Sequence, residues 1–220
     1  MSNTAADLFG EFPEAAEMQL GLARSTKEKS NLAAPESRVF AARRRREFRR
    51  ANSSAQLAEI LPDELSDGVS YHVISRGDID ARSYIEHVLA RQPLDCLLVS
   101  TWCMAMDDLE FFEACLIDGR IGRVDFYIGE IFPAQYPDEF FRMQRICKRH
   151  QATFAVARNH SKIMAGAHEA SGYYVVSESS ANINTNPRIE QTTLTRDESL
   201  YWHYRDFFDG IKSIHREHAI

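Results

Sequence analysis

The sequence lacks several patterns that mark particular protein classes. No Cys-x-x-Cys pair occurs among its four cysteines, Cys96, Cys103, Cys115 and Cys147. No apolar run approaches the roughly 18 residues of a membrane-spanning helix. Residues 1–12 are polar and acidic, without the basic and apolar regions of a secretory signal. We therefore expect reduced thiols, a cytoplasmic protein and no membrane partner.

Several catalytic and metal-binding patterns are also missing. Ser180 lies outside any Gly-x-Ser-x-Gly elbow, which disfavours a serine hydrolase. His72, His87 and His150 lack the spacing of metal ligands. No internal repeat is present, so the folding unit occurs once. We expect neither a metal nor an organic cofactor.

Positive charge is unevenly placed and is concentrated in one segment. The net charge is −6, yet residues 38–50 hold seven arginines against Glu47, a local charge of +6. An acidic body with one basic segment is not typical of a general nucleic-acid binder, but it is compatible with a local basic arm. The alternatives to a phosphate-binding arm are a solvated connecting helix and a protein-binding segment. The candidate nucleic-acid-binding residues are Arg43, Arg44, Arg45, Arg46, Arg49 and Arg50.

The length suits one domain with an N-terminal extension. Residues 1–36 are mostly polar and small, and we expect them to form a flexible segment. Residues 37–62 are expected to form a basic helical arm, with helices over 37–52 and 54–61. Residues 63–220 would then form the folded domain.

Strand and helix patterns alternate from residue 69 onward. Strands are expected over 69–75, 95–101, 123–128 and 151–157, and helices over 80–91, 107–117 and 137–150. The run at 95–101 is almost continuously apolar, which is typical of a strand covered on both faces. This alternation predicts an α/β fold with a largely parallel sheet flanked by helices.

The pattern changes after Ala157. Two short strand patterns, at 160–166 and 172–177, have the spacing of a hairpin, which would make the sheet mixed. Residues 189–195 predict another strand, and residues 197–218 predict a long amphipathic helix.

Five residues in this region provide groups suited to phosphoester chemistry. On a strand, His160 and Lys162 would share one face, about 6.5 Å apart. Histidine can attack phosphorus or transfer protons, and an ammonium can bind phosphate oxygens. Ser180 and Asn182 offer a hydroxyl and an amide, and Glu190 could orient a histidine through Nδ1. These five residues are the candidate catalytic set, and none of them requires a metal.

The set resembles the signature of the phospholipase D superfamily, which has His-x-Lys, a β-hairpin, Gly-Ser-x-Asn and then an acidic residue. The matching residues are His160-Ser161-Lys162, Ser179-Ser180-Ala181-Asn182 and Glu190. The surrounding Asn-His-x-Lys-Ile and Ile-Glu-Gln segments are similar to small single-motif members from phages and bacteria. Two positions depart from the pattern. Ala167 stands where the family often has aspartate, and Ser179 stands where it has glycine.

The resemblance implies a phospholipase D-like fold and a metal-independent phosphodiesterase, favoured here as a nuclease. His160 would form a phosphohistidine intermediate. Lys162 and Asn182 would bind phosphate oxygens with help from Ser180, and Glu190 would orient a histidine. Single-motif members take the second histidine from another subunit, so the resemblance also implies a homodimer with one composite site on the two-fold axis.

Other interpretations remain open. One is a catalytically weak or inactive phospholipase D-like protein that binds DNA or another phosphate-bearing partner. Another is an interaction module of phage or defence type whose acidic body contacts protein. Trp102 follows a strand end and would either line the site or join the core. His168 is expected in a hairpin loop, and His203 in helix packing.

Overall fold

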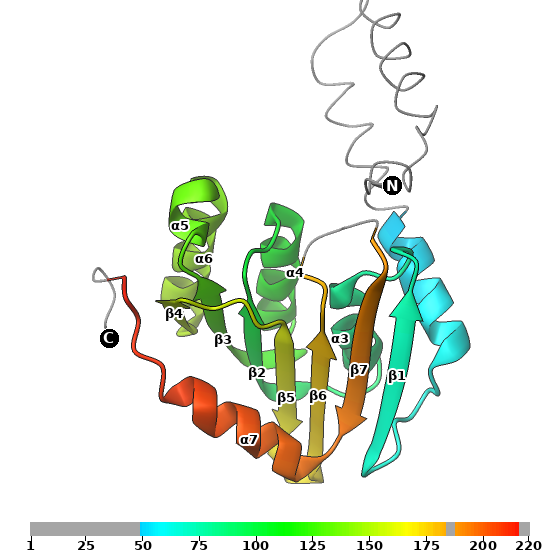
Figure 1. The fold of residues 1–220 in the computed structure, drawn as a ribbon. Coiled ribbons are helices and arrows are strands. Elements are labelled where there is room, and N and C mark those ends of the chain that lie inside the picture. The colour runs from blue at the N-terminus through cyan, green and yellow to red at the C-terminus, as the bar shows by residue number, and fades with distance from the viewer. Residues whose placement is uncertain (1–48, 184–187, 216–220) are drawn as a thin grey trace, which may run out of the picture. The chain divides into compact units, whose positions relative to one another are not determined.

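The computed structural model describes residues 49–183 and 188–215. Within them lies a seven-stranded sheet of order β1-β7-β6-β5-β2-β3-β4 (Figure 1). The strands are β1 (Val69–Ser75), β2 (Leu94–Thr101), β3 (Ile121–Gly129), β4 (Thr153–Ala157), β5 (Ile163–His168), β6 (Tyr173–Ser179) and β7 (Glu190–Arg196). The helices are α3 (Ala81–Leu89), α4 (Met106–Ile117), α5 (Phe132–Gln135), α6 (Pro137–His150) and α7 (Glu198–Asp209), with a short 3₁₀ turn, η2 (Glu169–Ser171). The segment expected at 1–36 and the arginines Arg43, Arg44, Arg45 and Arg46 lie outside the described residues.

The sheet is mixed, as the sequence predicts. β2 pairs in parallel with β3, and β3 with β4, whereas the four other ladders are antiparallel. These pairings make β5 and β7 run opposite to the other five strands. Parallel pairing is therefore confined to β2, β3 and β4, although most strands point the same way.

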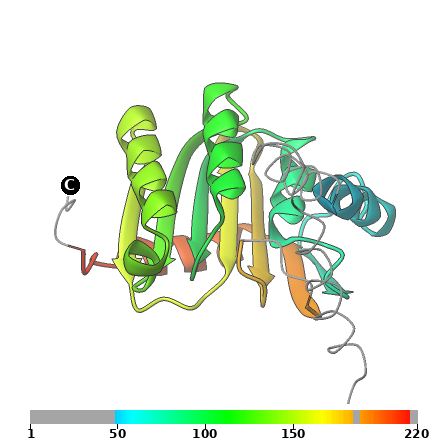
Figure 2. The ribbon, with the colours of Figure 1, turned by 90° about the horizontal axis from the view of Figure 1, so that it is seen from above.

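Helices cover both faces of the sheet. α3, α4 and α6 pack on one face, and α7 packs on the other (Figures 1 and 2). Successive residues of β2 serve the two cores, because side chains alternate along a strand. Leu97 and Val99 face the helices α3, α4 and α6, Leu98 faces α7, and all three are fully buried. The expectation of a strand covered on both faces is confirmed.

Local sequence explains where several helices begin and end. α6 starts at Pro137, because proline is favoured in the first helical turn, and ends before Gln151 in the left-handed conformation at φ 55°. α7 starts after Asp197, whose carboxylate accepts a hydrogen bond from the Leu200 amide at 2.7 Å. The described residues contain no helix long and apolar enough to cross a membrane.

Two predicted helices have different bounds in the structure. Residues 49–60 form one helix without the predicted break near residue 53. The predicted helix at 197–218 is too long, since α7 ends at Asp209. The following segment runs beside β4 instead, where the Ile214 amide donates to the Val156 carbonyl at 2.9 Å. Hydrogen bonding to this edge strand replaces the last predicted turns of the helix.

Candidate active site

The candidate catalytic residues lie at the end of the sheet where β2, β3, β4 and β6 finish (top of Figure 1). His160 and Lys162 lie in the connection from β4 to β5. Ser180 and Asn182 follow β6, and Glu190 is the first residue of β7. Ligands of open α/β sheets bind beyond the carboxyl ends of the strands, so this is the edge where a site is expected.

The pairing of His160 with Lys162 has a different origin from the one predicted. The strand expected over 160–166 begins only at Ile163, so both residues belong to a loop. Lys162 Nζ lies 2.9 Å from Nδ1 and 3.5 Å from Nε2 of His160, and it donates to the His160 carbonyl at 2.5 Å. The imidazole is exposed, whereas Lys162 is only 9% exposed.

Trp102 forms one wall beside the imidazole. Its ring centroid lies 5.5 Å from that of His160, and the ring also packs against the core, so both expected placements apply. β3 ends beside it at Gly129, where a Cβ atom would lie 2.5 Å from Trp102 Cδ1. The glycine therefore makes room for the indole next to His160.

Ser180 and Glu190 form a second pair. The Ser180 hydroxyl donates to Glu190 Oε2 and accepts from the Gln191 amide at 3.0 Å. Nδ1 of His160 faces Lys162, so the histidine-orienting role of Glu190 stays a prediction. The Asn182 Oδ1 atom is buried without a hydrogen-bond partner among the described residues, which leaves an unused polar group near the end of β6.

The charge of Lys162 is set by its surroundings. Burial lowers the pKa of its ammonium below the usual 10.5, and nearby Cys103 and Glu190 oppose that shift. The influence of Glu190 on Lys162 connects the two pairs electrostatically. The buried ammonium of Lys162 lies beside the exposed imidazole of His160. The ammonium can bind an anionic ligand at a position that the imidazole can attack.

The two departures from the family pattern have structural explanations. Ala167 is fully buried under α7, five residues along β5 from Lys162, which corresponds to roughly 16 Å. Position 167 therefore lies far from the candidate site, and having alanine there does not deprive the site of a polar side chain. Ser179 accepts from the Ala181 amide at 3.1 Å and bonds Thr192 at 2.8 Å, so its hydroxyl supports the turn after β6.

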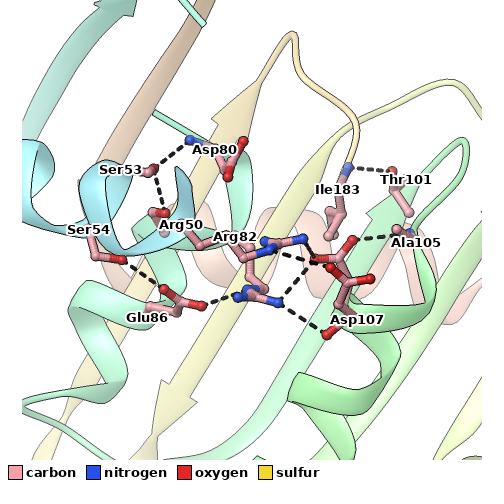
Figure 3. A network of polar contacts seen from close by, with 12 residues as sticks. Arg50, Ser53, Ser54, Asp80, Arg82, Glu86, Thr101, Ala105, Asp107 and Ile183 are labelled. Carbon is pink, nitrogen blue, oxygen red and sulfur yellow. Dashed lines mark hydrogen bonds and ion pairs between the residues drawn. The ribbon is translucent and has the colours of Figure 1, made fainter. Parts of the chain in front are cut away.

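The two described arginines of the basic segment bond to the protein itself. Arg49 donates to the Gly77 carbonyl at 2.9 Å. Arg50 is 7% exposed and donates to Asp108 at 2.7 Å, within the polar network of Figure 3. Arg82 reaches the same Asp108 oxygen at 3.4 Å. Arg50 thus has a structural partner, and its expected contact with nucleic acid is not supported by its burial.

The other described histidines have contacts away from His160. His72 bonds Thr193, His87 bonds the Pro62 carbonyl, and His168 bonds Ser171 in the predicted hairpin turn. His203 is exposed on α7 and contacts the Tyr204 ring. Within 49–183 and 188–215, no group of three or more histidine, cysteine or acidic residues is placed to hold a metal ion.

One cavity lies at the opposite end of the strands from the candidate site, with a volume of about 240 Å³. Its walls include His87, Arg91, Tyr173 and Arg196. It contains none of the candidate catalytic residues, so the cavity and the candidate site are separate features.

Sequence analysis assigned no role to four residues whose hydrogen bonds connect the loops of the candidate site: Ser100, Thr101, Asn159 and Ser161. The available signal was the pair of hydroxyl residues that ends the apolar run at 95–101. Polar side chains at the carboxyl end of a buried strand are well placed to bond the loops around a site.

Comparison with known proteins supports the fold. No protein-family model matches the sequence, and no curated protein matches it. Among solved structures, polyphosphate kinase from Porphyromonas gingivalis is similar over 67% of this chain and 27% of its own, with 16% identity and a TM-score of 0.50. Phosphatidylserine synthase from Haemophilus influenzae Rd KW20 is similar over 64% of this chain and 37% of its own, with 11% identity and a TM-score of 0.47. This chain thus spans only about a quarter of the kinase, and the likeness to the kinase confirms the predicted α/β fold with a mixed sheet flanked by helices.

Proposed function

We propose that this protein is a metal-independent phosphodiesterase that acts on nucleic acid with His160 as its nucleophile. The observation that carries the proposal is the placement of Lys162 Nζ 2.9 Å from Nδ1 of an exposed His160 at the carboxyl edge of the sheet. The nucleophile and the anion-binding cation therefore meet where a phosphodiester could reach both.

The proposed reaction has two steps. Nε2 of His160 attacks phosphorus, and a P–N bond forms as the P–O bond to the leaving group breaks. The leaving oxygen takes a proton from a second histidine. Water then attacks phosphorus, transfers its proton to that histidine and breaks the P–N bond. Lys162 and Asn182 stabilise the charge on the phosphate oxygens, with Ser180 held in place by Glu190.

The second histidine is proposed to come from another copy of the chain. The sequence has one copy of the motif, and the polar and ring contacts of the other described histidines are with residues outside the candidate set. A two-fold axis through the site would bring a second His160 opposite the first. The functional unit is then a homodimer with one composite site.

Nucleic acid is the proposed substrate because of the basic segment. Four consecutive arginines, Arg43 to Arg46, precede the described helix at 49–60 in the sequence. Arginine binds phosphate strongly, so this segment could hold a polyanion while the site cleaves it.

Hydrolysis in excess EDTA tests the proposal. The substrates are bis(p-nitrophenyl) phosphate and DNA, and the variant is His160→Ala. We expect the rate to fall more than about 1,000-fold, as when a nucleophile is removed. His168→Ala is the matched control, because His168 lies at the far end of β5 and bonds Ser171. DNA binding without turnover, unchanged by His160→Ala, would instead favour a non-catalytic binding protein.

A further inference from the structure

The last two residues of the central strand β2 contact the two loops that carry the candidate site. Ser100 and Thr101 are both fully buried, so neither side chain can touch a ligand. Their hydroxyls bond in different directions. Ser100 bonds the loop with His160, and Thr101 bonds the segment next to Asn182.

Ser100 closes a ring of hydrogen bonds around His160. The Asn159 amide donates to Ser100 Oγ at 2.9 Å, Ser100 Oγ lies 2.6 Å from Ser161 Oγ, and Ser161 Oγ donates to Asn159 Oδ1 at 2.7 Å. The second Asn159 amide hydrogen is donated to the Tyr127 carbonyl at 2.8 Å, and the Ser161 amide donates to Asn159 Oδ1 at 2.9 Å. The residues on both sides of His160 are thus tied to β2 and β3.

Thr101 fixes the second loop. Its hydroxyl donates to the Cys103 carbonyl at 2.9 Å and accepts from the Ile183 amide at 3.3 Å. Met104 and Ile183 also form a parallel bridge. Asn182, which precedes Ile183, is therefore held against the segment that leaves β2.

The same segment is anchored at its other end. The Ala105 amide donates to Asp108 at 3.0 Å, and Asp108 is bonded by Arg50 and Arg82. Figure 3 shows the contact of Thr101 with Ile183 beside this network. The residues from Thr101 to α4 are thus fixed at both ends, which keeps Trp102 in its place next to His160.

We propose that Ser100 and Thr101 are positioning residues that set the placement of His160 relative to Asn182. β2 is suited to this task because it is paired on both sides, by β3 and β5. The inference rests on the proposed function for its kinetic consequence, but the placement of His160 can be measured without turnover. Neither residue is expected to contact substrate.

The kinetic test uses Ser100→Ala, Thr101→Val and the conservative variant Thr101→Ser, with bis(p-nitrophenyl) phosphate as substrate. A misplaced nucleophile is expected to lower kcat about 10- to 100-fold in Ser100→Ala with little change in KM. Thr101→Val frees the loop that carries the Asn182 amide, which is proposed to bind phosphate, so KM is expected to rise. Thr101→Ser keeps the hydroxyl and is expected to restore KM.

The matched control is Ser53→Ala. Ser53 is equally buried and bonds Ser83 at 2.7 Å and the Asp80 amide at 2.8 Å, away from the site. It removes the same kind of buried hydroxyl, so kcat and KM are expected to stay within about two-fold. If Ser100→Ala does not fold, Ser161→Ala breaks the same contact from the loop side and is expected to give the same loss of kcat.

The second readout is the imidazole signal of His160 in ¹H–¹⁵N spectra, assigned with His160→Ala. Ser100→Ala is expected to shift or broaden that signal, and Ser53→Ala to leave it unchanged. If the wild type shows no turnover but Ser100→Ala moves the signal, the positioning role stands and the proposed function falls. An unmoved signal in both Ser100→Ala and Ser161→Ala overturns the positioning role.

Discussion

Lys162 Nζ lies 2.9 Å from Nδ1 of His160, so the proton on one group determines what the other can do. If Lys162 is an ammonium, it donates to Nδ1, and the imidazole proton sits on Nε2. If Lys162 is neutral, Nδ1 can carry the proton, and the Nε2 lone pair is free to attack. A bound phosphate that draws the ammonium away from Nδ1 would have the same effect as deprotonation.

Substrate affinity is expected to fall at alkaline pH. Burial lowers the pKa of Lys162 below 10.5, so the ammonium loses its proton at a lower pH than an exposed lysine would. Only the protonated form attracts a phosphodiester, which keeps one negative charge over this range. The dissociation constant of a non-hydrolysed phosphodiester, measured from pH 6 to 11, should rise before pH 10.5. In Lys162→Arg this weakening should disappear, since arginine stays charged. Constant affinity up to pH 10.5 in the wild type would contradict the prediction.

Asp108→Asn is expected to destabilise the fold strongly. Asp108 is fully buried and is bonded by Arg50 at 2.7 Å and Arg82 at 3.4 Å. Removing its charge takes the buried carboxylate away from both arginines, and only the pairs of Arg50 with Asp107 at 3.9 Å and of Arg82 with Glu86 at 2.6 Å remain. Breaking a buried ion pair costs about 3–5 kcal/mol. Urea unfolding measures the loss. Asp118→Asn, which breaks the exposed pair with Arg120, is the control and should change stability little.

The basic arm is tested by truncation at two positions. Deletion of residues 1–47 removes Arg43 to Arg46 but keeps Arg50 on Asp108. DNA affinity should fall, and the slope of log affinity against log salt should flatten by about 0.9 for each phosphate that the arginines no longer neutralise. Deletion of residues 1–52 should in addition lower the unfolding free energy, because it removes Arg50. If the shorter deletion leaves affinity and slope unchanged, the arginines belong to a solvated helix.

A composite site makes activity depend on both subunits. The protein should sediment as a dimer at micromolar concentration. After subunit exchange with an equal amount of His160→Ala, activity per wild-type chain should fall to about half, because only wild-type pairs hold two histidines. Sedimentation as a monomer, or activity per wild-type chain that the variant leaves unchanged, would rule the composite site out.

Local patterns were sufficient to predict most of the fold. The strand at Val69–Ser75 and the helix at Pro137–His150 have the predicted bounds, because the β-forming residues of the first and Pro137 in the second are signals within the segment itself. The end of α7 could not be predicted in this way. Ile211 and Ile214 continue the amphipathic pattern, but hydrogen bonds to β4 draw the chain out of the helix.

The residues of the candidate site could be proposed from the sequence, but their geometry could not. The contact of Ser100 with Ser161 joins residues 61 positions apart, and that of Arg50 with Asp108 joins residues 58 positions apart. Such partners leave no trace in local sequence. Charge alone therefore predicted a phosphate contact for Arg50, where the structure places a buried ion pair.

The most direct test of the account is the covalent state of His160 during turnover. The wild type is mixed with a phosphodiester in EDTA, and the reaction is stopped in alkali, which preserves phosphohistidine. The mass of the peptide that contains His160 is then measured by mass spectrometry. We expect this peptide to gain the mass of the phosphoryl group with its remaining ester during turnover, and the His160→Ala protein to show neither the adduct nor hydrolysis. Steady hydrolysis that leaves His160 unmodified and continues in His160→Ala would contradict the account.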